Sequence, residues 1–135
     1  MQLSQQKNLR EENIQPKVNL KGFEVFDDGE IKYTENILTP LILVESIPNY
    51  KENVFWYKIK NLWVLVGKIP PLTMTSNDVI LFKEKGKWGL FKIIEKKDNL
   101  LILTDGKGLR KTKVKEENLT EINLLGKVLR VQNRV

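Results

Sequence analysis

Residues 78–103 read DVILFKEKGKWGLFKIIEKKDNLLIL, and this stretch decides the fold class. Its three apolar segments, at residues 78–82, 88–94 and 100–103, are separated by the turn-forming groups Glu-Lys-Gly-Lys and Glu-Lys-Lys-Asp. A spacing of about ten residues is typical of consecutive strands in an all-β barrel or sandwich. The stretch therefore predicts an antiparallel meander.

The strand pattern continues upstream of this meander. Residues 22–26 and 30–34 flank Asp27-Asp28-Gly29, and an Asp-Gly pair between alternating segments predicts a hairpin. Residues 54–59 and 62–66 are rich in β-branched and aromatic side chains, which favour strands.

Other segments complete the expected organisation. Residues 41–44, after Pro40, predict a buried strand, and residues 67–77 predict a loop around Pro70-Pro71, because two prolines do not fit a central strand. A basic segment at residues 110–115 leads toward a closing strand at residues 125–131. We therefore expect a polar tail or linker at residues 1–21 and one mainly β domain at residues 22–135. This domain should hold about eight to ten short strands and little helix.

Composition excludes several classes of site. The chain has 135 residues, a length typical of one domain, and contains neither cysteine nor histidine. Disulfides, cysteine metal sites, histidine-ligated zinc and catalytic dyads or triads with histidine are therefore excluded. We expect no metal and no cofactor.

The charge balance is basic, with 23 Lys and Arg residues against 17 Asp and Glu residues and a net charge of +6. Such a balance suits nucleic acid or acidic partners, but it also suits a surface that only keeps a strand-rich domain soluble. The longest apolar runs, at residues 41–44 and 62–66, are far shorter than the roughly 20 residues that span a bilayer. The N-terminus lacks the apolar stretch of a signal peptide, so we expect a cytoplasmic protein with no membrane contact.

Basic residues gather around two predicted turns and give one candidate site. In a small β-barrel, their charge could follow a nucleic-acid backbone while an aromatic side chain stacks on a base. The alternative is a sheet edge protected by lysines, with the tryptophan in the core. The residues of this candidate face are Lys83, Lys85, Lys87, Trp88, Lys107, Arg110, Lys111, Lys113 and Lys115.

A serine nucleophile would need a lysine base in this chain, since histidine is absent. Ser76 lies in a turn-forming sequence, so Ser46 is the better candidate, with Lys58 or Lys60 as its base. The Gly-Asp that should follow such a serine in a Ser-Lys peptidase is missing after Ser46. The hypothesis of an active peptidase is therefore less favoured than the other hypotheses.

Residues 62–81 read LWVLVGKIPPLTMTSNDVIL, and they carry a family resemblance. Gly67, Thr73, Met74 and Asn77-Asp78 match, without a gap, the pattern V-x-G-D-S-M-x-P-T-hydrophobic-x-x-G-D. This pattern resembles the C-terminal domain of LexA and of phage repressors, which are self-cleaving Ser-Lys peptidases with a signal-peptidase-like β-fold.

Three later segments extend the resemblance over residues 62–135. Residues 91–94 resemble the family's V-K-R-L segment, which carries the lysine base, and place Lys92 there. Residues 103–106 resemble its L-S-D-N turn, and residues 122–131 resemble its closing strand. The resemblance thus implies a LexA-like complex β-fold.

The departures from the family pattern change the expected function. The alignment places Lys68 on the acidic residue, Ile69 on the nucleophile and Pro70 on the methionine. An isoleucine cannot attack a carbonyl, so the resemblance implies a pseudopeptidase rather than an enzyme. Residues 1–40 are also too short and too strand-like for the DNA-reading helix-turn-helix that usually precedes this domain.

What remains of the family's functions is self-association and the binding of a partner's extended segment in the former cleavage cleft. We expect Gly67, Lys68, Ile69, Pro70 and Lys92 to form that cleft. The first hypothesis is therefore a non-catalytic, repressor-type domain in transcriptional regulation, acting as a homodimer or with a regulatory protein partner. The alternative is a small basic β-barrel that binds nucleic acid directly.

Overall fold

The computed structural model describes residues 15–106, 108 and 110–132, and this part of the chain contains nine strands in one mixed sheet. The sheet order is β2-β1-β3-β4-β9-β5-β6-β7-β8. The expectation of a mainly β domain with little helix is therefore confirmed. The strand bounds are β1 Lys17–Val25, β2 Ile31–Pro40, β3 Val54–Ile59, β4 Leu62–Gly67, β5 Val79–Glu84, β6 Lys87–Lys97, β7 Leu100–Thr104, β8 Lys111–Lys115 and β9 Leu124–Gln132.

Four short helical segments connect these strands. They are the 3-10 turns η1 Leu41–Leu43, η2 Pro71–Thr73 and η3 Glu116–Asn118, and the single-turn helix α2 Tyr50–Asn53. All neighbouring strands pair antiparallel except β1 and β3, which pair in parallel. Among the described residues, no helix is long and apolar enough to cross a lipid bilayer.

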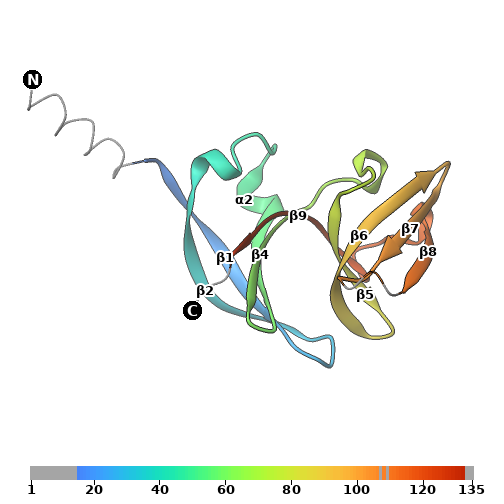
Figure 1. Ribbon diagram of the computed structural model, residues 1–135. Coiled ribbons are helices and arrows are strands. Elements are labelled where there is room, and N and C mark those ends of the chain that lie inside the picture. Colours follow the sequence, from blue (N-terminus) through green and yellow to red (C-terminus); the bar gives the residue numbers. More distant parts are fainter. Residues whose placement is uncertain (1–14, 107, 109, 133–135) are drawn as a thin grey trace, which may run out of the picture.

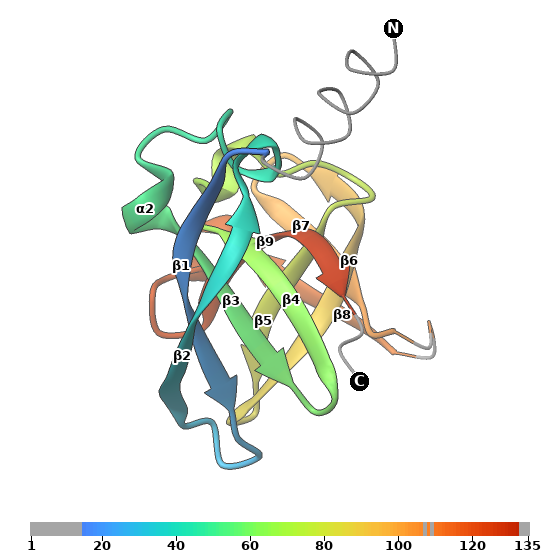
Figure 2. The same ribbon diagram turned by 90° about the vertical axis from the view of Figure 1, so that its left-hand side faces the viewer.

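The sheet is divided into two lobes that share β9. We call β1–β4 the N-terminal lobe and β5–β8 the C-terminal lobe (Figure 1). β9 runs between them and pairs with β4 on one side and β5 on the other. In the turned view, the N-terminal lobe lies in front of the C-terminal lobe (Figure 2).

Buried side chains of the described residues form three clusters. Side chains that alternate along β4 belong to two of these clusters, one on each face of the sheet. On β4, Trp63 and Leu65 belong to the cluster inside the N-terminal lobe. Val64 and Val66 point to the opposite face, into a cluster that also contains Leu81 of β5. Both faces of β4 are therefore buried, which is why residues 62–66 form an uninterrupted apolar run.

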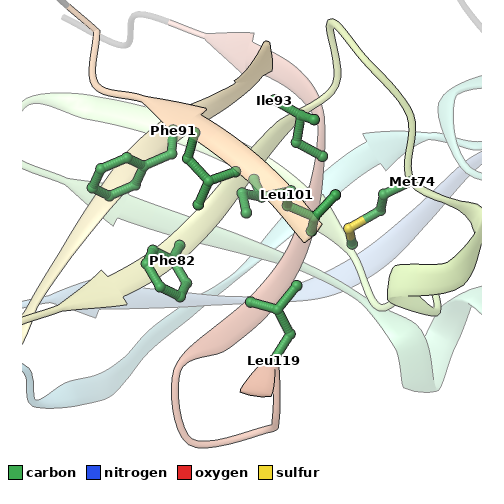
Figure 3. Close-up of a cluster of buried hydrophobic side chains, with 8 residues drawn as sticks. Met74, Phe82, Phe91, Ile93, Leu101 and Leu119 are labelled. Carbon is green, nitrogen blue, oxygen red and sulfur yellow. The ribbon is translucent and has the colours of Figure 1, made fainter. Parts of the chain in front are cut away.

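The third cluster fills the C-terminal lobe (Figure 3). Phe82, Phe91, Ile93 and Leu101 come from strands of the meander, as the sequence predicts. Met74 and Leu119 come from outside the strands, after η2 and after η3, and their side chains point into the same core (Figure 3). The two connecting segments are thus fixed to one lobe.

Several of the predicted boundaries are wrong. The turn predicted at residues 95–98 is shorter, because residues 95–97 belong to β6. Residues 17–21, assigned to the tail, are the first half of β1, while residues 1–14 lie outside the described residues. Residues 41–44 form η1 and its C-cap instead of a strand, because Pro40 ends edge strand β2 and the Val44 amide turns back to Leu41 O at 3.0 Å. The basic segment at residues 110–115 contains strand β8, in which Thr112 and Val114 alternate with lysines.

Candidate functional site

An apolar cleft lies where the chain leaves β4 and where β9 begins. It encloses about 290 Å³. One wall is the segment that follows β4, and the other wall is formed by the segment after η3 and the first residues of β9. The lining residues are Lys68, Ile69, Pro70, Pro71, Leu119, Thr120, Glu121, Leu124, Leu125 and Gly126.

The cleft is a local opening of the sheet. β9 pairs with β5 from Leu124 onward, but its pairing with β4 begins only at Lys127, opposite Gly67. Beyond Gly67, the chain turns away from β9 toward η2. Residues 124–126 therefore have no strand partner on the β4 side within the described part of the chain. That side borders the cleft.

Gly126 allows the two chain segments to cross in close contact just where their pairing ends. Its φ is +149°, and a Cβ built on it would overlap the carbonyl oxygen of Gly67. The Gly67 backbone thus crosses directly over Gly126. Only a residue without a side chain permits this approach, which closes one end of the cleft.

The first wall is built from residues that cannot continue the sheet. Pro70 and Pro71 lack a backbone N–H, so they donate nothing to a strand ladder. The Lys68 amide still bonds to Asn53 O at 2.7 Å, which holds the start of this segment against the end of α2, just before β3. The Ile69 Cδ1 atom lies 3.7 Å from the position of a Cβ on Gly67, so this side chain packs back toward β4.

Lys96 of β6 anchors this wall from the C-terminal lobe. Its Nζ donates to the carbonyl oxygens of Pro71 at 3.3 Å, Leu72 at 2.8 Å and Met74 at 3.0 Å. The same Nζ lies 3.5 Å from Glu116 Oε1, a buried atom with no hydrogen-bond partner of its own. Lys96 thereby connects the η2 segment of one wall to η3, which precedes the other wall.

The second wall is a self-bonded turn. The Thr120 amide donates to Asn123 Oδ1 at 2.8 Å, and the Leu124 amide donates to Thr120 O at 2.9 Å. These bonds present Ile122 to solvent, with 78% of its surface exposed. Leu72, in the segment of the opposite wall, is 74% exposed. Each wall thus carries one apolar side chain that the fold leaves uncovered.

The structure brings together part of the predicted cleft. Lys68, Ile69 and Pro70 line it, and Gly67 is the last residue of β4 at its end. Lys92 does not line it, since this residue is exposed on β6. Its neighbours Phe91 and Ile93 face the C-terminal core, so Lys92 points to the other side of the strand. The lysine that reaches the loop after Ile69 is Lys96.

Lys96 could not be recognised from the sequence. A β-bulge in β6, between Ile93 and Glu95, shifts the alternation of side chains and turns Lys96 inward. Without the bulge, Lys96 would share a face with Lys92. It could also not be recognised from the sequence that residues 124–126 lack a strand partner on the β4 side in the described part of the chain. This feature depends on where the pairing between β4 and β9 stops.

The residues of the active-peptidase hypothesis are not brought together. Ser46 is exposed after η1, and the next residue, Ile47, packs 3.3 Å from a Cβ position on Gly67. Gly67 pairs with Val54 at the start of β3, whereas Lys58 is the fifth residue of this strand and Lys60 lies in the turn after its end. The two ends of a six-residue strand are about 17 Å apart.

The predicted nucleic-acid face separates into two groups. Lys83, Lys85 and Lys87 lie on the β5–β6 hairpin, while Lys111, Lys113 and Lys115 are exposed on β8. Arg110, just before β8, forms an ion pair with Glu84 at the end of β5. Lys107 lies outside the described residues.

Trp88 is a packing residue rather than a free stacking platform. Its ring packs against the cluster between the lobes, and its Nε1 donates to Gly29 O at 3.0 Å. Lys83 Nζ lies 5.7 Å from the ring centroid. The indole therefore joins the β5–β6 hairpin to the β1–β2 turn.

No metal site gathers in the part of the chain that the structure describes, where no three Asp or Glu side chains approach closely enough to hold an ion. No protein-family model matches the sequence, and no curated protein matches it. The resemblance to the LexA domain therefore rests on the residues alone and stays a prediction.

Proposed function

We propose that this protein is a non-catalytic binding domain whose cleft takes up an extended, apolar segment of a partner protein. One observation carries the proposal. Residues 124–126 of β9 lack a partner on the β4 side, and this side borders the apolar cleft. A peptide strand that adds there would pair with the main chain around Leu125, because the Leu124 amide already donates to Thr120 O and the Gly67 backbone crosses over Gly126.

The chemistry of the walls favours an uncharged, apolar segment. Ile69, Pro70 and Leu125 supply apolar surface inside the cleft. Leu72 and Ile122 lie in the two segments that form its walls, and their side chains are exposed. The charged lining residues Lys68 and Glu121 have opposite signs, so the cleft favours neither an acidic nor a basic segment. Alternate side chains of the bound strand would then select for apolar residues.

Two features support binding without catalysis. Ile69, which stands where the resemblance places a nucleophile, is a cleft-lining hydrocarbon side chain. Lys96, the lysine that reaches this loop, donates to three carbonyl oxygens and faces a carboxylate. These contacts give Lys96 a structural role in the wall.

The biological setting follows from the resemblance. LexA-type domains act in transcriptional regulation, so the proposed partner is a regulatory protein whose extended segment occupies the place of the family's cleavage segment. Self-association would use the same cleft if the segment came from a second copy of the chain.

The test is a peptide selection with matched variants. The full chain would be used to select from a displayed library of random nine-residue peptides, and the affinity of selected peptides would be measured by isothermal titration. Ile122→Asp places a charge on the turn that forms one wall of the cleft, and we expect it to weaken binding roughly tenfold or more, because a bound apolar segment would bury that charge at a high cost. The control is Ile42→Asp, since Ile42 is 72% exposed in the N-terminal lobe and outside the cleft.

The proposal predicts selected peptides with alternating apolar residues, bound normally by Ile42→Asp and poorly by Ile122→Asp. Equal loss of binding in both variants would contradict it, and so would selected peptides that are mainly charged. A cleft variant that still bound the peptides with full affinity would place the binding site elsewhere.

A further inference from the structure

The outer face of the C-terminal lobe has a regular arrangement of lysines. Direct cross-strand pairs in β6, β7 and β8 form three rows, and residues paired in this way share one face of the sheet. The rows are Lys92-Thr104-Lys111, Glu95-Ile102-Lys113 and Lys97-Leu100-Lys115. The inward side of the same strands carries the core residues Ile93, Leu101 and Leu103.

We call the five lysines of these rows the lysine face: Lys92, Lys97, Lys111, Lys113 and Lys115. All five are exposed. Among the described residues, none of them forms an ion pair, whereas Lys96, Lys127 and Arg110 do. Glu95 is the one carboxylate in the three rows. The face is therefore an uncompensated positive surface.

The net charge of the protein is concentrated in the same half of the chain. Residues 79–115, which span β5–β8, contain 11 Lys and Arg residues against 4 Asp and Glu residues, while residues 17–67, which span β1–β4, contain 6 against 7. A surface needed only for solubility has no reason to collect its positive charge in one lobe. A potential of one sign over one lobe attracts polyanions and orients the molecule toward them.

We infer that the lysine face binds a nucleic-acid duplex through its phosphate backbone. The rows contain no aromatic side chain, so the face offers nothing on which an unpaired base could stack. Phosphate contacts from lysines position a protein without reading sequence. The face extends about 14 Å along β8 and about 10 Å across three strands, which suits several phosphates at once.

A duplex fits this surface better than an anionic membrane does. Proteins that lie on membranes add exposed aromatic or apolar side chains to their basic residues. Leu100 and Ile102, the apolar members of the rows, are half-buried between the lysines of β6 and β8. Ile94, the bulged residue of β6, is 40% exposed. A single exposed aliphatic side chain beside five lysines supplies little apolar surface for insertion into lipid.

The test measures the anisotropy of a labelled 20-base-pair DNA duplex and of an RNA duplex with the full chain, over a series of salt concentrations. Five phosphate contacts predict a slope of log affinity against log salt near −4.5. The variant Lys111→Gln/Lys113→Gln/Lys115→Gln should reduce the size of this slope by about 2.7 and weaken binding at low salt roughly tenfold or more.

The control is Lys21→Gln/Lys51→Gln/Lys60→Gln, which removes the same charge from exposed positions of the N-terminal lobe. It should bind the duplexes almost as the unchanged protein does. Circular dichroism would confirm that both triple variants are folded, and amide shifts of the unchanged protein on adding duplex should map to β6–β8. Binding of both the DNA and the RNA duplex would indicate recognition of the phosphate backbone. Binding of only one would show which of the two nucleic acids the lysine face binds.

Several results would overturn the inference. One is an equal loss of affinity in the two triple variants, since net charge alone would then account for binding. Another is binding to vesicles of anionic lipid without binding to either duplex. Tighter binding to a single strand than to the duplex, or amide shifts confined to the N-terminal lobe, would also contradict it.

Discussion

Gly126 shows how a single residue shapes the candidate site. The backbone of Gly67 crosses over it so closely that a Cβ would lie 2.8 Å from the Gly67 carbonyl carbon and 2.9 Å from Val66 Cγ1. Real Cβ atoms do not approach other atoms at these distances, and φ at Gly126 is also one that L-residues rarely adopt. The close crossing therefore depends on glycine.

We expect Gly126→Ala to lower the free energy of unfolding by about 3 kcal/mol or more, from backbone strain and overpacking together. The matched control is Gly86→Ala. Gly86 also has a positive φ, of +80°, but its added Cβ would meet nothing within 4 Å. Its cost should be about 1 kcal/mol, from backbone strain alone. Urea unfolding of both variants checks this, and equal losses would refute the role of the crossing.

Tyr57 gives the protein a specific sensitivity to alkaline pH. Burial in the cluster between the lobes raises the pKa of the Tyr57 phenol from 10.0 to about 12. The unfolded chain releases this proton near pH 10 while the folded chain still holds it. Stability from the buried phenol is therefore complete below pH 10 and is lost as the pH rises from 10 toward 12.

At pH 11, this loss should be about 1.4 kcal/mol, and it should approach about 3 kcal/mol above pH 12. Tyr57→Phe removes the titrating group, so its free energy of unfolding should fall less than that of the unchanged protein between pH 9 and pH 11. The comparison cancels the titration of lysines, which both proteins share. If Tyr57→Phe and the unchanged protein showed the same pH dependence in urea unfolding, folding would not raise the pKa of Tyr57.

At the scale of elements, Lys96 fixes the connecting segments to the strands. It joins the η2 segment to Glu116 of η3 through one ammonium group. Lys96→Met would leave Glu116 without its cation and three carbonyl oxygens without their donor. We expect a loss of about 2–3 kcal/mol in the free energy of unfolding.

Lys97→Met is the matched control for this prediction, because Lys97 is the exposed neighbour of Lys96 on the same strand. Its effect on thermal or urea unfolding should lie within about 0.5 kcal/mol of zero. If both variants unfolded alike, Lys96 would be an ordinary surface residue. Peptide binding should also weaken in Lys96→Met alone, since one cleft wall loses its anchor.

The elements also show what a sequence can predict. The β1–β2 hairpin, the β3–β4 hairpin and the β5–β6–β7 meander were predicted correctly, because alternation and turn chemistry are local properties. The four apolar residues at 41–44 form η1 and its cap instead of a strand, since a short apolar run fits either structure. Strand β8 was missed because its lysines hid the alternation with Thr112 and Val114.

The cleft was predicted only in part, for a physical reason. Lys68, Ile69 and Pro70 are neighbours in sequence, so one motif places them together. The other wall lies about fifty residues away, and it meets the first because β9 returns between β4 and β5. The orientation of Lys92 and Lys96 depends on a bulge that leaves no clear mark in the sequence.

For the whole molecule, β9 and the cluster between the lobes join two half-sheets into one unit. The cluster combines Val64 of β4 with Leu81 of β5, and β9 contributes pairing to both lobes. Neither lobe can lose its structure without exposing apolar surface of the other. The lobes should therefore unfold together.

Amide hydrogen exchange can test this cooperativity. The slowest amides of β4 and of β6 should report the same free energy of opening, equal to the global value. Leu65→Ala, in the N-terminal core, should lower both values by a similar amount, about 3 kcal/mol. A decrease confined to amides of the N-terminal lobe would show that the lobes unfold independently.

The central claim is that a partner segment adds as a strand to residues 124–126 of β9. The most direct measurement is the set of nuclear Overhauser effects between a selected peptide and the full, isotope-labelled chain. The account predicts an extended peptide with backbone contacts to residues 124–126 and side-chain contacts to Ile69 and Pro70. A peptide that pairs instead with edge strand β2 or β8, without contacts to β9, would contradict it.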